Sequence, residues 1–248
     1  MAASLGRTVK MKTKIELYYD VMSPFSWFAF EVCFSFIHSA NIVILKVLHR
    51  YKPHWNIDLQ LKPVLLAGII KTIGTTPEML KPRNSHYQQE DIKRCAKYFN
   101  VPMKLNDSVY ESVIGRGTLM PCRFLTAIDL LHPSLLENAS RELWKSAWSK
   151  HEDILSAEVL GSAGLAAGLT PEALAEVKEQ MSQPATKERL KAYTDEAVEH
   201  GAFGVPTVVT HAGAKPQLFF GSDRFHLIAR EINETWMGPE PDAVCTKL

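Results

Sequence analysis

The feature that most limits the fold of this chain is a strand that ends directly before a helix start. Residues 14–21 (KIELYYDV) are rich in β-branched and aromatic residues and predict a buried strand. Ser23 then suits the N-cap position and Pro24 the first helical position, which together form a strong helix-start signal. Residues 57–66 alternate in hydrophobicity and predict a second strand. A strand–helix–strand unit favours a right-handed crossover and a parallel pair of strands.

The pattern changes twice further along the chain. From Gln88 to about His200 it is helical, and we expect about five helices and no strand there. Two helix starts are expected within it, at Thr170-Pro171 and at Gln183-Pro184. Residues 204–209 and 217–220 then predict a β-hairpin, and residues 225–236 predict a last helix. The helices therefore stand between two groups of strands that can share one sheet.

This order of elements predicts an α/β fold, a thioredoxin-like βαβ…ββα domain interrupted by an all-helical insertion domain. We expect the thioredoxin-like domain to be discontinuous, over residues 12–80 and 198–240. The helical insertion domain is expected to span residues 81–197.

Some helical residues have predicted packing roles. Apolar residues at helical spacing from Leu135 to Trp148 predict a wide buried face, with Ser140 and Glu137 on its polar side. Trp144 and Trp148 are expected in the core or at a contact between subunits. Glu31, in the helix after Ser23, is expected to be a solvated helix residue rather than an acid catalyst.

Composition argues against several classes of partner. Of the 248 residues, 46% are hydrophobic and 22% are charged. The net charge of +1 is too small to attract nucleic acid by electrostatics, so we expect no nucleic-acid partner. The longest apolar stretch, about residues 37–48, is too short for membrane insertion. Four widely spaced cysteines without a C-x-x-C motif argue against a zinc site or a dithiol redox centre, and these are Cys33, Cys95, Cys122 and Cys245.

The histidines also lack the spacing of metal ligands, so no metal site is expected. We expect surface or helix-capping positions for four of them, His86, His132, His200 and His211. The chain ends Thr246-Lys247-Leu248, one residue away from the S-K-L peroxisomal address.

The turn at Ser23 has the properties of a thiolate site. A helix N-terminus carries unpaired N–H groups and about half a positive charge, which favours an anion. Thioredoxin-fold redox enzymes place C-x-x-C at such a turn and lower a thiol pKa there. Here the four residues are S-P-F-S, from Ser23 to Ser26, so the site forms no disulfide but has a hydroxyl to donate to an external thiol. The alternative is a plain Ser-Pro helix cap.

Two further motifs belong at matching places in such a fold. In thioredoxin-like folds the proline at the position of Pro206 is cis and brings backbone beside the active turn, whereas a trans proline at a strand start is the alternative. Gly221-Ser222-Asp223 stands at a predicted helix start, where N–H groups suit a carboxylate and Asp223 suits an ammonium group. A simple capped helix is the alternative for this second motif.

Together these residues resemble the kappa-class glutathione transferases. The resemblance covers nearly the whole chain through the motifs Y-Y-D-V-x-S-P-F-S-W, N-I-D-L-Q-L-K-P, R-F-L-T-A, A-S-R-E-L-W, H-G-A-F-G-V-P-T, F-G-S-D-R and W-M-G-P. It implies a thioredoxin-like domain interrupted by helices, similar to the DsbA-type disulfide oxidoreductases. It also implies a homodimer in the mitochondrial matrix, the peroxisome or both, which the Thr246-Lys247-Leu248 ending suits.

The resemblance assigns a role to each candidate site residue. Ser23 faces the sulfur of glutathione, and Pro24 and Phe25 line the same turn. Val205, before the cis Pro206, pairs its backbone with the cysteinyl part of glutathione. The γ-glutamyl end is held by two residues, Ser222 and Asp223.

The chain departs from the family pattern at three places. Thr75 stands where the family usually has an asparagine, and Asn84 where a lysine is usual. Both changes are expected to weaken the hold on the glycyl end of glutathione. Residues 34–49 resemble an extra insertion inside the helix after Ser23 or at its exit. This segment is unusually apolar for a loop, and the alternatives are that it extends the helix, exposes an apolar surface or destabilises the fold.

Three functions are consistent with these residues. The first is a glutathione transferase that conjugates the glutathione thiolate to a small hydrophobic electrophile placed over Phe25 and Trp27, with glutathione as co-substrate and no permanently bound cofactor. The second is a glutathione-dependent isomerase of the 2-hydroxychromene-2-carboxylate type. The third is a non-catalytic thioredoxin-fold binding or chaperone-like protein. A dithiol oxidoreductase is the least supported reading, because the turn has no cysteine.

Overall fold

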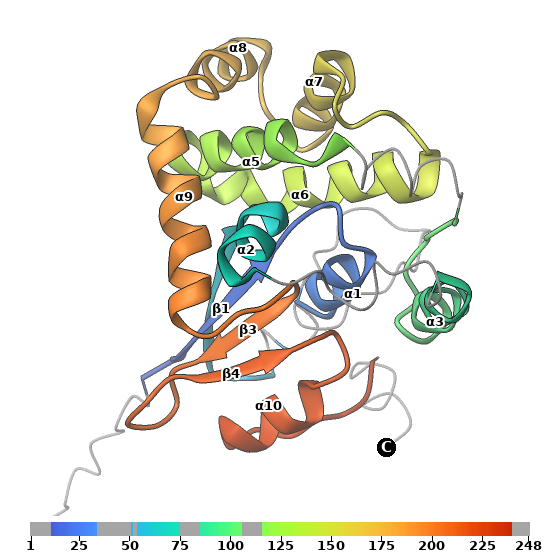
Figure 1. The fold of residues 1–248 in the computed structure, drawn as a ribbon, viewed down its shortest axis with the longest axis vertical. Helices are drawn as coiled ribbons and strands as arrows, with labels where there is room; N and C mark the ends of the chain where they lie inside the picture. The colour runs from blue at the N-terminus through green and yellow to red at the C-terminus, as the bar shows by residue number, and fades with distance from the viewer. Residues whose placement is uncertain (1–10, 34–50, 52–53, 75–84, 106–115, 240–248) are drawn as a thin grey trace, which may run out of the picture.

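A four-stranded sheet lies below a block of helices in the computed structural model (Figure 1). The structure describes residues 11–33, 51, 54–74, 85–105 and 116–239. The strand order is β2-β1-β3-β4, with β1 and β2 parallel and the other neighbours antiparallel. The four strands are β1 (Thr13–Tyr19), β2 (Ile57–Pro63), β3 (Thr207–Thr210) and β4 (Gln217–Phe220).

Three helices accompany the strands of the sheet. They are α1 (Pro24–Cys33), α2 (Leu66–Ile73) and α10 (Phe225–Glu231). The predicted strand 57–66 ends earlier than expected, and α2 begins where it was expected to finish. The α2 helix stops at Gly74, whose φ of 71° lies in the left-handed region that glycine tolerates.

The helical block follows the predicted pattern. Thr170 caps α8 by accepting from the Ala173 N–H, and proline occupies the first turn of both α8 and α9, as the sequence predicts. Among the described residues the block contains α3 (Ser85–Tyr98), α5 (Leu119–Leu131), α6 (Leu136–Lys145), α7 (Ala157–Ala166), α8 (Pro171–Gln180) and α9 (Pro184–Glu199), with short turns of 3₁₀-helix at Pro133–Leu135 and π-helix at Ser146–Lys150.

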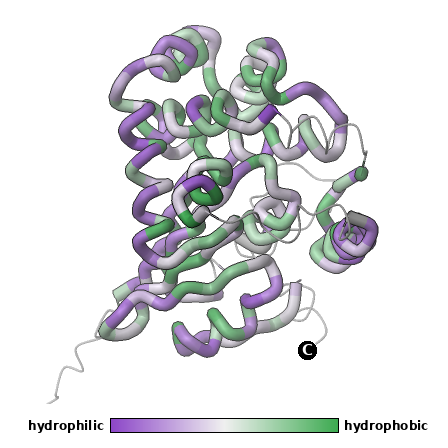
Figure 2. Tube along the Cα trace, in the orientation of Figure 1, coloured by the Kyte–Doolittle hydropathy of each residue, from purple (hydrophilic) through white to green (hydrophobic). Residues whose placement is uncertain are grey.

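One hydrophobic core joins the sheet to the helical block. Phe30 of α1 packs on Trp144 of α6 with ring centroids 4.6 Å apart, and both side chains are fully buried. Trp144 and Trp148 are thus core residues, as predicted, and the apolar face of α6 is confirmed. Figure 2 shows the complementary pattern, with hydrophilic residues on the outer turns of α8 and α9.

Ser140 is the exception on α6, because it was expected on the polar side. Its side chain is fully buried, and its Oγ lies 2.7 Å from the hydroxyl of Tyr19. The polar side chain faces the core because β1 supplies a hydrogen-bonding partner there.

Two element boundaries also differ from the sequence prediction. The strand expected over 204–209 begins at Thr207, after the Val205–Pro206 bond. The last helix ends at Glu231 rather than residue 236, because Asn233 adopts a left-handed φ of 56° that stops the helix.

Trp236 then folds back to stack on Phe225, with ring centroids 5.8 Å apart. Within the described part of the chain, no helix combines the length and apolarity that crossing a bilayer requires.

Candidate active site

The Ser23 turn joins the end of β1 to the start of α1. The Ser23 Oγ accepts the backbone N–H of Ser26 at 3.1 Å, which is the bond of a helix N-cap. Pro24 has no N–H, and the Trp27 N–H is bonded to the Ser23 carbonyl. Of the described groups in this first turn, the N–H of Phe25 is therefore the donor left without a partner.

The cis Val205–Pro206 segment lies against this turn. Its peptide bond is cis, as expected for the proline of a thioredoxin-like fold. The Ser23 hydroxyl donates to the Val205 carbonyl at 3.5 Å, the long limit of a hydrogen bond. The Ser23 proton therefore has a weak acceptor, and a stronger acceptor placed beside it can take over the bond.

Gly221 connects the same segment to the third predicted motif. Its N–H donates to the Pro206 carbonyl at 3.0 Å, which places Ser222 and Asp223 next to the cis-proline strand. Gly221 has a φ of 99°, and a Cβ added there would lie 2.7 Å from the Asp223 carboxylate. Both the backbone conformation and the space thus require glycine. Helix α10 begins only at Phe225, so Ser222 and Asp223 lie in a turn before it rather than in its first turn.

A cleft of about 420 Å³ opens beside this turn. It is lined by Ser222 and Asp223, by Tyr98 at the end of α3 and by Phe99, which follows that helix. The remaining lining residues are Arg94, Cys95, Phe225, His226 and Trp236. An elongated polar ligand held by Ser222 and Asp223 would therefore meet a mainly aromatic wall.

Asp20 supports the turn from behind. Its carboxylate accepts the N–H of Met22 at 2.9 Å, the N–H of Leu66 at 2.9 Å and the hydroxyl of Thr118 at 2.8 Å. Burial raises the pKa of Asp20 above its ordinary value, against the effect of these hydrogen bonds. The carboxylate thereby ties the active turn to the first residues of α2 and to the start of α5.

Helix α1 is held at its other side by Glu31. The sequence predicts a solvated residue here, but Glu31 is buried, with 6% of its surface exposed. It accepts the indole N–H of Trp27 at 3.0 Å and the Arg141 Nε–H at 3.1 Å. That prediction was wrong because the partner lies 110 residues away, on α6 of the helical block.

Two thiols near the candidate site, those of Cys95 and Cys122, are poor nucleophiles. Burial raises the pKa of Cys95 to about 11, with the charges of Asp91 and Asp223 acting in the same direction. Burial likewise raises the pKa of Cys122 well above its ordinary value, and both cysteines are free. Neither of these two thiols therefore suits the role of a thiolate at Ser23.

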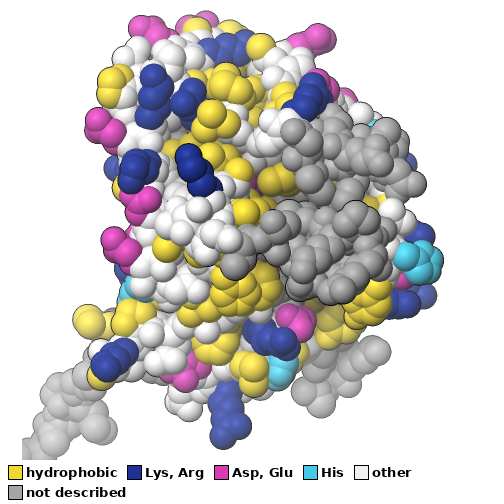
Figure 3. Space-filling model, in the orientation of Figure 1, with side chains coloured by type: hydrophobic (Ala, Val, Ile, Leu, Met, Phe, Trp, Pro, Cys, Tyr) yellow, Lys and Arg dark blue, Asp and Glu magenta, His cyan; other side chains and the backbone are white. Residues whose placement is uncertain are grey.

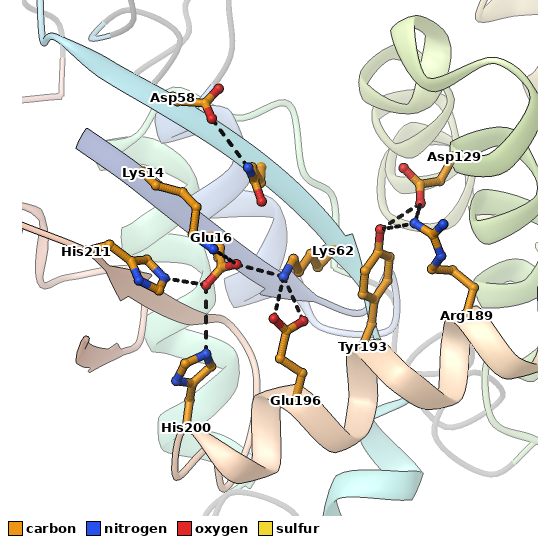
Figure 4. A network of polar contacts seen from close by, with 11 residues as sticks. Lys14, Glu16, Asp58, Lys62, Asp129, Arg189, Tyr193, Glu196, His200 and His211 are labelled. Atoms are coloured by element: carbon orange, nitrogen blue, oxygen red, sulfur yellow. Dashed lines mark hydrogen bonds and ion pairs between the residues drawn. The ribbon is translucent and has the colours of Figure 1, made fainter. Parts of the chain in front are cut away.

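A second polar cluster surrounds Glu16, the middle residue of β1 (Figure 4). The Glu16 Oε1 accepts from Lys14 at 2.6 Å and from Lys62 at 2.7 Å, while Oε2 lies 2.6 Å from the His211 Nε2. Burial alone would raise the pKa of Glu16, but these three hydrogen bonds lower it to about 2.

Two of the histidines that the sequence places on the surface or at caps belong to this cluster. His200 does cap the C-terminus of α9, and its Nε2 lies 3.8 Å from the Glu16 Oε2. The sequence did not predict that these residues lie together, because Glu16 is 195 residues before His211 and no local spacing connects them.

Comparison with known proteins supports the fold and identifies the family. A family model described as a DSBA-like thioredoxin domain matches residues 14–233. A solved structure of 2-hydroxychromene-2-carboxylate isomerase has the same fold, with a TM-score of 0.64 and 18% identity over 94% of this chain and 97% of that one. The chain is therefore a member of the DSBA-like thioredoxin family.

Its sequence relatives are more specific. Glutathione S-transferase kappa 1 of Homo sapiens is 39% identical over 94% of this chain and 97% of the human protein. The Rattus norvegicus protein of the same name is 38% identical over the same shares of the two chains. Within the DSBA-like family, the chain belongs to the kappa-class glutathione transferases.

The structure brings most of the predicted site residues together. Ser23 meets Val205 directly, and Gly221 links Pro206 to the turn that carries Ser222 and Asp223. Pro24 is buried and Phe25 partly exposed in the turn itself. Thr75, Asn84 and the apparent insertion 34–49 lie outside the described residues.

Proposed function

We propose that this chain is a glutathione transferase in which Ser23 stabilises the glutathione thiolate for attack on small hydrophobic electrophiles. The observation that carries the proposal is the long 3.5 Å bond from the Ser23 hydroxyl to the Val205 carbonyl, at a helix N-terminus. A thiolate is a stronger acceptor than a carbonyl, because it carries a full charge. The hydroxyl proton can turn to the sulfur while the Ser23 Oγ keeps the N–H of Ser26.

The energies involved are sufficient for this role. A free thiol titrates near 8.5, and lowering its pKa by about 1–2 units makes most of it thiolate at neutral pH. One unit corresponds to about 1.4 kcal/mol, and a hydrogen bond to a charged group contributes about 1.5–3 kcal/mol. The Phe25 N–H and the α1 dipole add to the same effect.

The proposed pose of glutathione follows from the connected motifs. The cysteinyl backbone pairs with Val205, beside the cis-proline, and the sulfur reaches Ser23. The γ-glutamyl end extends to Ser222 and Asp223, whose position is set by the bond from Gly221 to Pro206. Both assignments of glutathione groups follow the family resemblance.

Trp27, over which the electrophile was expected, is fully buried, so that part of the prediction was wrong. Other apolar side chains close to these groups provide a place for the electrophile. Phe203 precedes Val205 by two residues, is 50% exposed and packs against Phe220. Leu119 and Met120 are 41% and 44% exposed and directly follow Thr118, which contacts Asp20. Figure 3 shows that hydrophobic side chains are exposed in the middle of the face drawn there. An apolar electrophile approaching the sulfur would bury part of this surface.

The decisive variant is Ser23→Ala. We expect the pKa of the bound glutathione thiol to rise by about 1–2 units and kcat/KM with 1-chloro-2,4-dinitrobenzene to fall about 10–100-fold, since each unit is a factor of ten. Ultraviolet titration of the bound thiolate measures the first effect, and a steady-state conjugation assay measures the second. Calorimetry shows separately whether the variant still binds glutathione. Ser23→Thr, which keeps a hydroxyl and a helix cap, is the control and should retain most of the activity.

Each outcome of this experiment decides between functions. An unchanged thiol pKa and turnover in Ser23→Ala would show that the role assigned to Ser23 is wrong. Turnover of a 2-hydroxychromene-2-carboxylate without consumption of glutathione would indicate the isomerase instead of the transferase. A folded chain that binds no glutathione would leave only the non-catalytic reading.

We further propose, on the family resemblance alone, that the chain forms a homodimer and resides in the mitochondrial matrix, the peroxisome or both. Analytical ultracentrifugation of the purified chain measures its oligomeric state. Fractionation of cells that express the chain with its native C-terminus measures its compartment. A monomer, or a chain confined to the cytosol, would contradict the respective proposal.

A further inference from the structure

Three potential metal-ligand atoms converge on the side of the sheet covered by α9 (Figure 4). They are Glu16 Oε2 on β1, His200 Nε2 at the end of α9 and His211 Nε2 directly after β3. All three atoms lie within 4.8 Å of one another. Each comes from a different element, so the sheet and helix packing holds them together rather than one flexible loop.

The distances suit a small divalent ion. Zinc binds nitrogen and carboxylate oxygen at about 2.0–2.2 Å, which in a tetrahedron separates neighbouring ligand atoms by about 3.3 Å. The Glu16 Oε2 lies 2.6 Å from the His211 Nε2 and 3.8 Å from the His200 Nε2. Both values are within about 1 Å of the required separation, so small side-chain rotations would admit the ion.

The neighbouring charges orient the carboxylate toward the histidines. Lys14 and Lys62 both bond the other oxygen, Oε1, which leaves Oε2 directed at the two imidazoles. Lys62 is itself paired with both oxygens of Glu196, at 2.8 Å and 2.6 Å, so its charge is balanced. Such outer contacts fix the orientation of a metal-ligating carboxylate in known sites.

The cluster is also open enough to bind an ion from solution. The side chains of His200 and His211 are 23% and 25% exposed, while Glu16 is fully buried behind them.

We propose that Glu16, His200 and His211 form a binding site for a divalent transition-metal ion, with zinc as the most suitable probe. Two imidazoles and one carboxylate are a common zinc ligand set, with a water in the fourth position. The ion replaces the proton that His211 now shares with Glu16 and joins the end of α9 to β1 and β3. Since Glu16 is the middle residue of β1 and Ser23 lies beyond the end of that strand, the site is separate from the proposed glutathione site.

The test is calorimetric titration of zinc into the full-length, chelator-treated chain without glutathione. We expect one equivalent to bind, and His200→Gln and His211→Gln each to weaken the affinity at least about tenfold. His86→Gln, an exposed histidine on α3, is the matched control and should bind zinc like the unaltered chain. A cobalt(II) spectrum without a thiolate charge-transfer band separates this ligand set from binding at cysteines.

The histidine variants carry the test because Glu16→Gln would disturb the buried pairs with Lys14 and Lys62. Near-ultraviolet circular dichroism should show that both histidine variants are folded. Equal zinc affinity in the unaltered chain and the His200→Gln/His211→Gln double variant would overturn the proposal. So would the absence of zinc binding to the unaltered chain, in which case the cluster is a network of ion pairs and shared protons only.

Discussion

Asp20 is the residue on which the geometry of the active turn depends most. Its two carboxylate oxygens bond Met22 in the turn, Leu66 in α2 and Thr118 at the start of α5. The Asp20 carbonyl also accepts the N–H of Ser23 at 3.0 Å. A single buried side chain thus positions the Ser23 hydroxyl relative to two other helices.

This burial gives Asp20 a measurable influence on stability. Because burial raises its folded-state pKa, the folded chain binds the proton more tightly than the unfolded chain does. The resulting stabilisation is fully present below about pH 4, the pKa of an unfolded aspartate, and is lost as the pH rises through the folded pKa. Each unit of that pKa rise corresponds to about 1.4 kcal/mol.

We therefore predict that the difference in unfolding free energy between the unaltered chain and Asp20→Asn decreases as the pH rises above about 4. The asparagine amide also faces N–H donors, so the variant is less stable by an offset that does not titrate. Urea unfolding of both proteins from pH 4 to pH 8 measures the slope apart from this offset. A difference that is constant or grows with pH would contradict the raised pKa.

At the scale of elements, β1 and α6 are joined by one buried hydrogen bond. The Ser140 hydroxyl donates to the Leu136 carbonyl at 2.8 Å, so it accepts from the Tyr19 hydroxyl at 2.7 Å. Burial raises the pKa of Tyr19 well above its ordinary value, which keeps the phenol a neutral donor. This bond connects the strand that carries the active turn to the helical block.

The two halves of this bond should not be equally costly to remove. Ser140→Ala leaves the buried Tyr19 hydroxyl without an acceptor, which costs about 1–3 kcal/mol. Tyr19→Phe leaves Ser140 its bond to Leu136 and costs about 0.5–1.5 kcal/mol. Chemical unfolding of both variants and of the double variant measures these costs. A larger loss in Tyr19→Phe, or additive losses in the double variant, would show that the bond is not the connection described.

The sequence predicts elements where the signal is local and fails where it is not. The Ser23-Pro24 and Thr170-Pro171 helix starts were predicted correctly, because caps and first-turn prolines act within four residues. Ser140 and Glu31 were placed wrongly, because their partners Tyr19 and Arg141 lie over 100 residues away.

The same distinction applies to the sites. The three motifs of the candidate active site stand out in sequence, each as a short turn signal. The convergence of Glu16, His200 and His211 has no local signature, because one residue lies on a strand, one at a helix end and one in a loop. The role of Asp20 was not predicted for a similar reason, because its hydrogen bonds to Leu66 and Thr118 depend on tertiary packing.

At the scale of the whole molecule, the two predicted domains share one core. A single buried hydrophobic cluster contains Ile15 of the sheet, Trp27 of α1, Trp144 of α6 and Val177 of α8. Polar contacts cross the same boundary, including Arg141 with Glu31 and the Thr118 hydroxyl with Asp20. Neither part keeps its buried surface if the other unfolds. Separating them would therefore expose apolar area and break the buried ion pair between Arg141 and Glu31.

We therefore predict one cooperative unfolding transition for the described fold, although chains of this length often unfold in stages. Tryptophan fluorescence reports on both parts, because Trp27 lies on α1 and Trp144 and Trp148 lie in the helical block. Far-ultraviolet circular dichroism is dominated by the helices. The two signals should give the same midpoint in guanidinium chloride. Arg141→Met should lower both midpoints together, because it leaves the buried Glu31 carboxylate without its cationic partner. Two separated midpoints, or a shift in only one signal, would mean that the helical insertion unfolds on its own and that the shared core does not couple it to the active turn.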